Sequence, residues 1–162
     1  MEYEFRPPTA ADAREVLGWR YAAPYEIYNA DPLNEHGDSA NLRDPATRYF
    51  VATDGTGAVV GFCCYGADAR VAGGDYRDSD ALDIGLGLRP DLTGHGQGRA
   101  FLDAALAFGR EHLGARCYRL TVAAFNKRAI RVYERAGFRA IERFRHGGLP
   151  AGLEFVLMRE GR

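Results

Sequence analysis

Three glycines at alternate positions, Gly94, Gly96 and Gly98, form the segment of this 162-residue chain that is best suited to holding an anion. They follow an apolar run at residues 82–88 and precede a long stretch with apolar residues at helical spacing. Glycine allows unusual backbone dihedrals and close approach, so successive N–H groups can point at one anion beside a helix N-terminus. A pyrophosphate fits this arrangement, and a glycine-rich turn with a purely structural role is the alternative.

Two common phosphate-binding motifs do not match this segment. A P-loop needs Lys and then Ser or Thr after its last glycine, whereas Gly98 is followed by Arg99 and Ala100. A dinucleotide-binding fingerprint needs G-x-G-x-x-G near an N-terminal strand, with an acid about 20 residues later. The even spacing of these three glycines differs from that pattern. Both motifs are therefore excluded.

A second segment, residues 126–138, predicts a helix with a tyrosine on its apolar face. Asn126 is a good N-cap, Gly137 is a stop signal, and Tyr133 shares one face with Ala129. A phenol, with a pKa of about 10, keeps its proton at neutral pH and can donate it to a leaving group. A tyrosine that only fills the core is the alternative.

The two segments together resemble the conserved core of the GNAT superfamily, the acetyl-CoA-dependent N-acetyltransferases. In that family a strand with a following proline leads to Q/R-x-x-G-x-G/A, which the chain matches at residues 93–98 except that Thr93 replaces Gln or Arg. The second family signature, Asn-x-x-Ala-x-x-x-Tyr-x-x-x-Gly-Phe, is met in full. The resemblance extends over the whole chain, since the N-terminal strand, two helices and hairpin also fit the family order.

The resemblance implies an α/β fold of the α+β type. It implies a mixed, mostly antiparallel seven-stranded sheet that splays between strands 4 and 5 to admit the cofactor, with helices on both faces. We expect one N-acetyltransferase domain over residues 1–162. The expected co-substrate is acetyl-CoA, and the acetyl group would pass directly to an amine in a ternary complex.

The resemblance also implies roles for particular residues. The pyrophosphate would be held at the glycines, and backbone N–H groups near Leu86 to Leu88 would receive the carbonyl oxygen. Gly85 and Gly87 suit a β-bulge there, with simple close packing as the alternative. Tyr133 would be the proton donor. The expected cofactor contacts are Leu86, Gly87, Leu88, Thr93, Gly94, His95, Gly96, Gln97, Gly98, Arg99, Asn126 and Tyr133.

The general base is the least determined part of the site. Asp83 lies where many relatives place a Glu that works through a water molecule, and a structural carboxylate is the alternative. Glu26 and His36 are other candidates. Deprotonating a lysine-like amine at neutral pH costs roughly 4–5 kcal/mol, and an α-amine only about 1 kcal/mol, so an acceptor of low pKa needs little help. On the acceptor side the family arrangement implies the aromatic residues Trp19, Tyr21, Tyr25 and Tyr28.

Hydrophobic patterning predicts the elements that position these residues. The run at 82–88 is expected to be a strand buried on both faces. Residues 34–44 are expected to be loop, residues 67–79 a loop suited to mobility, and residues 21–32 a second helix or an irregular lid. Strands are predicted at 3–6, 48–53, 58–65, 82–88, 118–122, 138–145 and 153–158, and helices at 9–19, 96–113 and 126–136.

Composition limits the choice of partners. A net charge of −1 gives no reason to expect nucleic acid or an anionic membrane, and no stretch reaches membrane-spanning length. Basic residues outnumber acids over residues 110–145, as on a face that meets a phosphorylated ligand or on a solvated helix surface. Three cysteines with no metal-ligand spacing suggest unpaired thiols, a cytoplasmic location and no metal. The expected partner is a small-molecule or peptide amine, and a homodimer is left open.

Overall fold

The computed structural model describes residues 1–31, 35–147 and 153–161, except for the side chains of Glu35 and His36. Short 3₁₀ helices cover Tyr25–Tyr28, Pro45–Thr47, Ala67–Ala69 and Pro90–Leu92. The helices and strands are β1 (Glu4–Arg6), α1 (Ala10–Leu17), α2 (Glu35–Arg43), β2 (Tyr49–Thr53), β3 (Val59–Tyr65), β4 (Leu82–Leu88), α3 (Gly98–Leu113), β5 (Tyr118–Ala123), α4 (Lys127–Arg135), β6 (Phe138–Arg145) and β7 (Glu154–Glu160).

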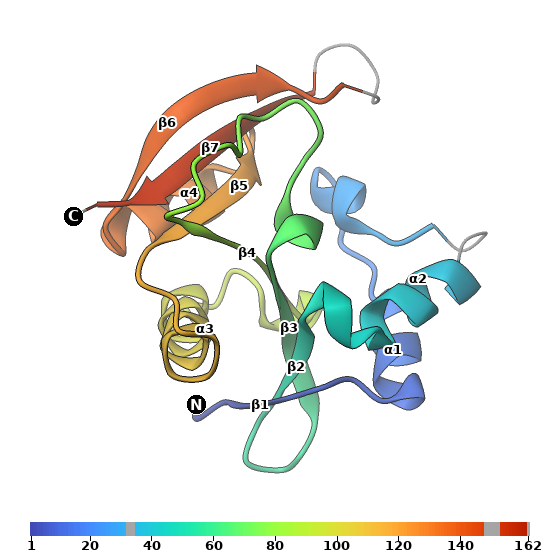
Figure 1. Ribbon diagram of the computed structural model, residues 1–162. Helices are drawn as coiled ribbons and strands as arrows, with labels where there is room; N and C mark the ends of the chain where they lie inside the picture. Colours follow the sequence, from blue (N-terminus) through green and yellow to red (C-terminus); the bar gives the residue numbers. More distant parts are fainter. Residues whose placement is uncertain (32–34, 148–152, 162) are drawn as a thin grey trace.

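One seven-stranded sheet runs through the molecule in the order β1-β2-β3-β4-β5-β7-β6 (Figure 1). All neighbouring strands are antiparallel except β4 and β5, which are parallel. That parallel pair is short, since only Leu82 with Tyr118 and Asp83 with Arg119 are in register. The predicted splay between the fourth and fifth strands is therefore confirmed.

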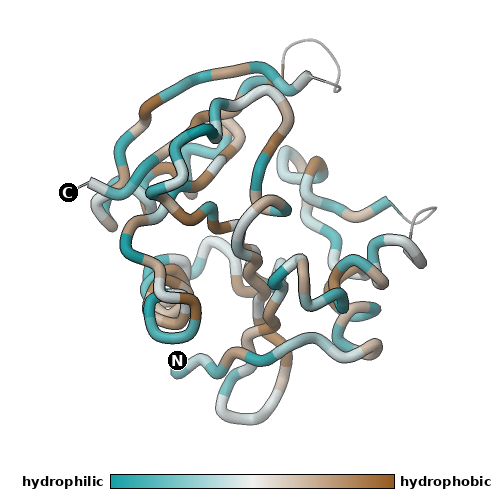
Figure 2. The backbone as a smooth tube through the Cα atoms, viewed as in Figure 1, coloured by the Kyte–Doolittle hydropathy of each residue, from teal (hydrophilic) through white to brown (hydrophobic). Residues whose placement is uncertain are grey.

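Helices cover both faces of the sheet, as predicted. On one face Leu102, Ala105 and Leu106 of α3 pack with strand residues such as Ile84 and Leu120, and the apolar side of α4 lies against the same cluster. On the other face Val16 of α1 packs with Val51 and Val59. Figure 1 shows α1 and α2 on the opposite side of β2 and β3 from α3. Figure 2 shows the hydrophobic residues concentrated along the central strands and the inner side of α3.

The helix ends follow the sequence signals. Thr9 and Asp12 form a capping box at the start of α1, in which each side chain bonds the other residue's backbone N–H. Gly114 ends α3 with φ 67°, a left-handed conformation that glycine adopts without strain. Asn126 caps α4, and Gly137 follows its end with φ 95°.

Two expectations about local structure were wrong. Most of the segment predicted as loop at 34–44 is the helix α2, whose Leu42 is buried and which packs beside α1. Tertiary packing here outweighs the low helix propensity of Gly37, Ser39 and Asn41. The strand β4 is fully buried only at Asp83 and Ile84, because beyond Asp83 it has no β5 partner beside it.

Candidate active site

The splay leaves one edge of β4 without a strand partner. Gly66 donates its N–H to the carbonyl of Asp83 at 2.8 Å, and Arg89 donates to the carbonyl of Val60 at 2.9 Å. Backbone N–H and C=O groups alternate in direction along an antiparallel strand. In the residues between these two bonds they therefore point alternately toward β3 and away from it. Leu86 and Leu88 are the residues whose N–H and C=O groups point away from β3, into the gap.

The predicted bulge at Gly85 and Gly87 was wrong. The pairing of β3 with β4 runs without a break from Gly61 opposite Leu88 to Tyr65 opposite Ile84. A Cβ on Gly87 would lie 2.7 Å from the Phe62 ring, and one on Gly85 would lie 3.1 Å from the Cys64 sulfur. The two glycines therefore serve close packing. The backbone of Gly87 pairs with β3, so it offers no N–H to a cofactor, contrary to our expectation.

The glycine segment forms an open turn into α3. Gly94 and Gly96 have φ of 78° and 79°, in the left-handed region where glycine is favoured. Gly98 is the first residue of α3, and among the described residues no side chain caps this helix. Its first N–H groups consequently lack partners within the helix. A Cβ on Gly96 would meet no atom within 4 Å, so this turn has room beside it. These features suit an anion at the start of α3.

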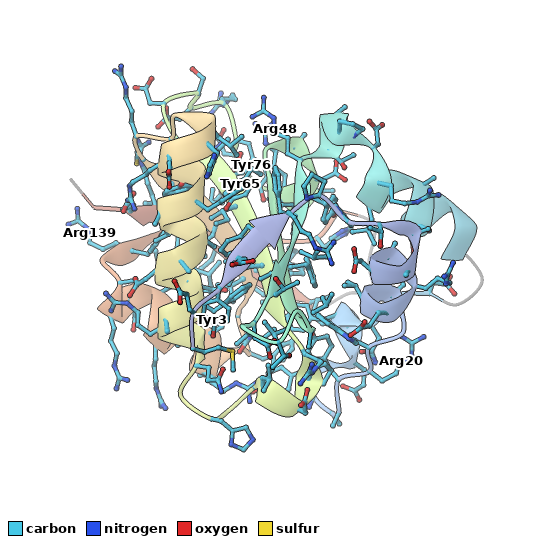
Figure 3. The ribbon with its side chains drawn as sticks, turned by 90° about the horizontal axis from the view of Figure 1, so that it is seen from below. Tyr3, Arg20, Arg48, Tyr65, Tyr76 and Arg139 are labelled. Atoms are coloured by element: carbon cyan, nitrogen blue, oxygen red, sulfur yellow. The ribbon has the colours of Figure 1, made fainter. Side chains whose placement is uncertain are left out.

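The side chains around this turn mostly support it. Thr93 donates its hydroxyl to the carbonyl of Pro90 at 2.8 Å, and Gln97 accepts from the Tyr3 hydroxyl at 3.4 Å. Figure 3 shows Tyr3 beside α3. The Arg99 guanidinium bonds Asp103 and donates to the carbonyl of Arg135, whereas the His95 side chain is exposed. The side chains of Thr93 and Arg99 are thus already engaged. The Thr93 N–H also bonds the carbonyl of Pro90 at 3.3 Å, so of these two residues Arg99 is the one with a backbone N–H available to an anion.

Helix α4 brings Asn126 and Tyr133 to the other side of the gap. Asn126 is buried; its Oδ1 accepts from the Ala129 N–H at 3.1 Å, and its Nδ2 donates to the Tyr28 hydroxyl at 3.2 Å. The Tyr133 ring packs edge-on to Phe138. Burial, with a smaller effect from the nearby Tyr28 phenol, raises the pKa of Tyr133 well above its usual range. Its hydroxyl forms no hydrogen bond with any residue that the structure describes, so this protonated phenol is available to a ligand.

The proposed base Asp83 is instead the centre of a buried ion pair. Arg119 donates from Nε to Oδ1 at 2.7 Å and from Nη2 to Oδ2 at 2.9 Å, and Arg70 donates from Nε to Oδ2 at 2.9 Å. The Asp83 and Arg119 side chains are only 2% and 1% exposed. Both oxygens of this carboxylate are thus engaged by charged N–H donors. This geometry favours the structural alternative over the base role.

Residues 19–29 form a segment that contacts both sides of the gap. The Tyr21 hydroxyl donates to the carbonyl of Leu88 on β4 at 2.7 Å, while Tyr28 contacts Asn126 at the start of α4. The Asn29 amide closes the segment, accepting from the Tyr21 N–H at 2.7 Å and donating to the Tyr21 carbonyl at 3.3 Å. The predicted irregular lid is thus one 3₁₀ turn held to both sides of the splay.

The structure does not bring all the predicted acceptor residues together. Tyr25 and Tyr28 lie at the gap, with the Tyr25 ring 5.9 Å from Phe125. Trp19 is only 9% exposed and packs with Val16 and Val51, because it belongs to the core that holds α1 on the sheet. We therefore remove Trp19 from the acceptor site. Glu26 is exposed, and the His36 side chain lies outside the described residues.

Comparison with known proteins agrees with this geometry. A model of the acetyltransferase (GNAT) family matches residues 12–138, most of the chain. The chain belongs to the GNAT acetyltransferase family. It is 41% identical over 98 residues to a mycothiol acetyltransferase from Propionibacterium freudenreichii; the match covers 60% of this chain and 29% of that relative, less than a third of its length.

The fold of this GNAT chain is shared by solved structures. A spermidine N-acetyltransferase chimera from Vibrio cholerae and hSSAT superposes with a TM-score of 0.75 at 19% identity, covering 99% of this chain and 95% of the other. A GNAT acetyltransferase from Bacillus anthracis gives a TM-score of 0.72 at 16% identity, covering 98% and 94%. Among the described residues, no helix has the length and apolarity to cross a membrane.

Two residues at the site of this GNAT chain were not singled out from the sequence. Arg119 completes the ion pair with Asp83, and only the register of β4 with β5 places them together. Arg128, in the first turn of α4, lies beside the glycine turn, with Nη1 3.2 Å from where a Cβ of Gly94 would stand. The excess of basic residues over 110–145 was the available signal for Arg128, but it did not distinguish one arginine from the others.

Proposed function

We propose that this chain transfers the acetyl group of acetyl-CoA to a primary amine by direct attack in a ternary complex. Family membership supports the reaction type, and the open glycine turn suits the pyrophosphate of the co-substrate. The observation that carries the proposal is the gap beside β4. There the backbone groups of Leu86 and Leu88 point away from β3, and α4 holds the hydroxyl of Tyr133 without a partner among the described residues.

Each part of the site has a task in this reaction. The backbone N–H groups of residues 94–99 hold the negative pyrophosphate at the positive end of α3. A backbone N–H of Leu86 or Leu88 donates to the acetyl oxygen as that oxygen gains negative charge. Burial raises the pKa of Tyr133, so its phenol is protonated at neutral pH and gives that proton to the sulfur as the C–S bond breaks; the proton that the attacking amine loses as the amide forms restores the phenol.

Asp83 is occupied by two arginines, so the amine gains no help from that carboxylate. An amine that is already partly neutral fits this site best. At neutral pH an α-amine loses its proton for about 1 kcal/mol, against roughly 4–5 kcal/mol for a lysine-like amine. We therefore propose a small-molecule or peptide amine of low pKa as the acceptor, contacted by Tyr25 and Tyr28.

A screen of amines with detection of released thiol tests this proposal. The panel contains amino acids, dipeptides, amino sugars and spermidine, each with acetyl-CoA and with calorimetric binding of CoA measured in parallel. We expect saturable CoA binding and thiol release with at least one α-amine. Absence of CoA binding would refute the proposal. Binding without thiol release for any amine would instead indicate an acyl-CoA sensor with the same fold.

A further inference from the structure

Arg128 lies between the glycine turn and residues 21–29, which we call the acceptor segment. It is exposed in the first turn of α4, with one guanidinium nitrogen beside Gly94 on one side. On the other side its guanidinium carbon lies 4.6 Å from the centre of the Tyr25 ring. The same charge also lowers the pKa of Tyr28 to a small extent, against the larger effect of burial. One side chain therefore touches the glycine turn, where we propose the pyrophosphate, and the segment proposed to face the acceptor.

The charge of Arg128 has no counter-ion in the part of the chain that the structure describes. Arg99, by contrast, pairs with Asp103 and bonds a carbonyl of α4. Arg128 also sits at the positive end of the α4 dipole, next to Lys127, where a cation is unfavourable. Its planar face is occupied by Tyr25, which leaves the N–H groups on its edge available for a bidentate bond. This combination fits an anion supplied by a ligand.

We propose that Arg128 binds the pyrophosphate of CoA opposite the backbone N–H groups of the glycine turn, and that it thereby couples CoA binding to the order of residues 21–29. This inference rests on the proposed function, because it requires CoA at the turn. The guanidinium edge bonds phosphate oxygens while its face stays on Tyr25.

The coupling follows from contacts already present in the acceptor segment. Tyr25 is held between Arg128 and Phe125, Tyr28 bonds Asn126, and Asn29 closes the loop on Tyr21. An arginine fixed by phosphate loses freedom and so restrains the ring stacked on it. CoA then orders the acceptor segment before the amine arrives. By reciprocity, an amine bound to that segment increases the affinity for CoA by the same factor.

Calorimetry tests the binding part of the proposal. Arg128→Gln removes the charge, and Arg139→Gln is the matched control, since Arg139 is exposed on β6 and points outward (Figure 3). We expect Arg128→Gln to weaken binding of CoA and of 3′-dephospho-CoA about tenfold, as for loss of a charge-assisted hydrogen bond. Pantetheine, which lacks the pyrophosphate, should bind both variants as it binds the wild type. Arg139→Gln should stay within twofold throughout.

Hydrogen exchange tests the coupling. In the wild type, saturating CoA should slow exchange of the backbone amides at residues 21–29 several-fold. Arg128→Gln at saturating CoA should lose this protection. Tyr25→Leu should lose it too, while keeping CoA affinity within about fivefold, because an exposed cation–π contact is weak. Arg128→Lys keeps the charge without the planar face. It should therefore keep much of the CoA affinity but lose most of the slowed exchange at residues 21–29.

The outcomes separate this proposal from the function on which it rests. Wild-type protein that binds no CoA refutes both. If the wild type binds CoA and Arg128→Gln binds it with the same affinity, only the role of Arg128 is overturned. A loss for CoA but not for 3′-dephospho-CoA would place Arg128 at the 3′-phosphate and overturn the pyrophosphate assignment. Loss of affinity with full protection of residues 21–29 would overturn the coupling.

Discussion

Replacing Asp83 with asparagine distinguishes a structural carboxylate from a catalytic base. In the native protein the carboxylate accepts two N–H groups from Arg119 and one from Arg70. Asparagine keeps one acceptor oxygen and turns an NH₂ group toward a guanidinium. Arg119, 1% exposed, would then be a buried cation with its main counter-ion removed. The substitution therefore leaves an uncompensated charge in the sheet at the last pair of the β4–β5 ladder, where the two strands begin to separate.

The expected cost is about 3 kcal/mol, the lower end of the 3–5 kcal/mol for breaking one side of a buried ion pair. We take the lower end because Arg119 keeps bonds to the carbonyls of Asp78 and Tyr76. For a chain of this length the loss corresponds to a fall in Tm of roughly 6–12 °C. Arg70 is 43% exposed, so Arg70→Gln is a milder control and should cost about 1 kcal/mol or less.

Two measurements on the same samples distinguish a structural carboxylate from a catalytic base. They are denaturant unfolding and the acetyl-transfer rate at a temperature where Asp83→Asn is folded. If Asp83 is structural, the folded variant keeps kcat within a few-fold of the wild type while the unfolding midpoint drops. A catalytic base would instead cost about 10²–10⁴ in rate. An unchanged Tm with a hundredfold loss of kcat would refute our interpretation of this residue.

Three further substitutions test other parts of the structure. Tyr133→Phe should lower kcat about a hundredfold and leave CoA affinity and Tm near wild type, because the hydroxyl bonds no described residue; unchanged turnover in steady-state assays would exclude the proton-donor role. Gly87→Ala should cost about 1–3 kcal/mol in chemical unfolding, since its Cβ would meet the Phe62 ring at 2.7 Å; a neutral effect would show that the ring can move away. The Arg6 hydrogen bond, helped by Thr9, lowers the pKa of Asp12 from 3.8 to about 2, so this carboxylate stabilises the fold above about pH 4 and the contribution is lost as pH falls toward 2. Asp12→Asn should remove about 1–2 kcal/mol of that acid-dependent stability, allowing for the half-exposed Arg6, and a variant with the wild-type pH dependence of unfolding would contradict this.

Local signals in the sequence predicted the elements that form the proposed cofactor side. The glycine turn, the Asn126 cap and the Gly114 and Gly137 stops depend on single residues whose backbone preferences are strong, and each was found where predicted. The acceptor side depends on contacts between distant residues. Tyr21 reaches Leu88, and Tyr28 reaches Asn126, across 67 and 98 positions in sequence. No periodicity or turn preference encodes such pairs.

The role of Asp83 could not be predicted for a related reason. Its partner Arg119 lies 36 positions later, and the two meet because β4 and β5 pair in parallel for two residues only. A carboxylate between apolar residues is equally consistent with a base and with an ion pair until its neighbours are known. Family resemblance favoured the first interpretation, and the geometry of the three N–H donors favours the second.

The side chains of β4 alternate between the two faces of the sheet, and this alternation explains how the gap arises. On one face Ile84 and Leu86 pack toward α3 and α4, and Leu88 packs with Phe101 of α3. On the other face lies the charged Asp83, followed by Gly85 and Gly87, which have no side chains. The Asp83–Arg119 pair holds β4 to β5 at the last rung of the ladder. Beyond it, the backbone of β4 faces residues 21–29, so in the proposed reaction this ion pair would set where the amine and the acetyl group meet.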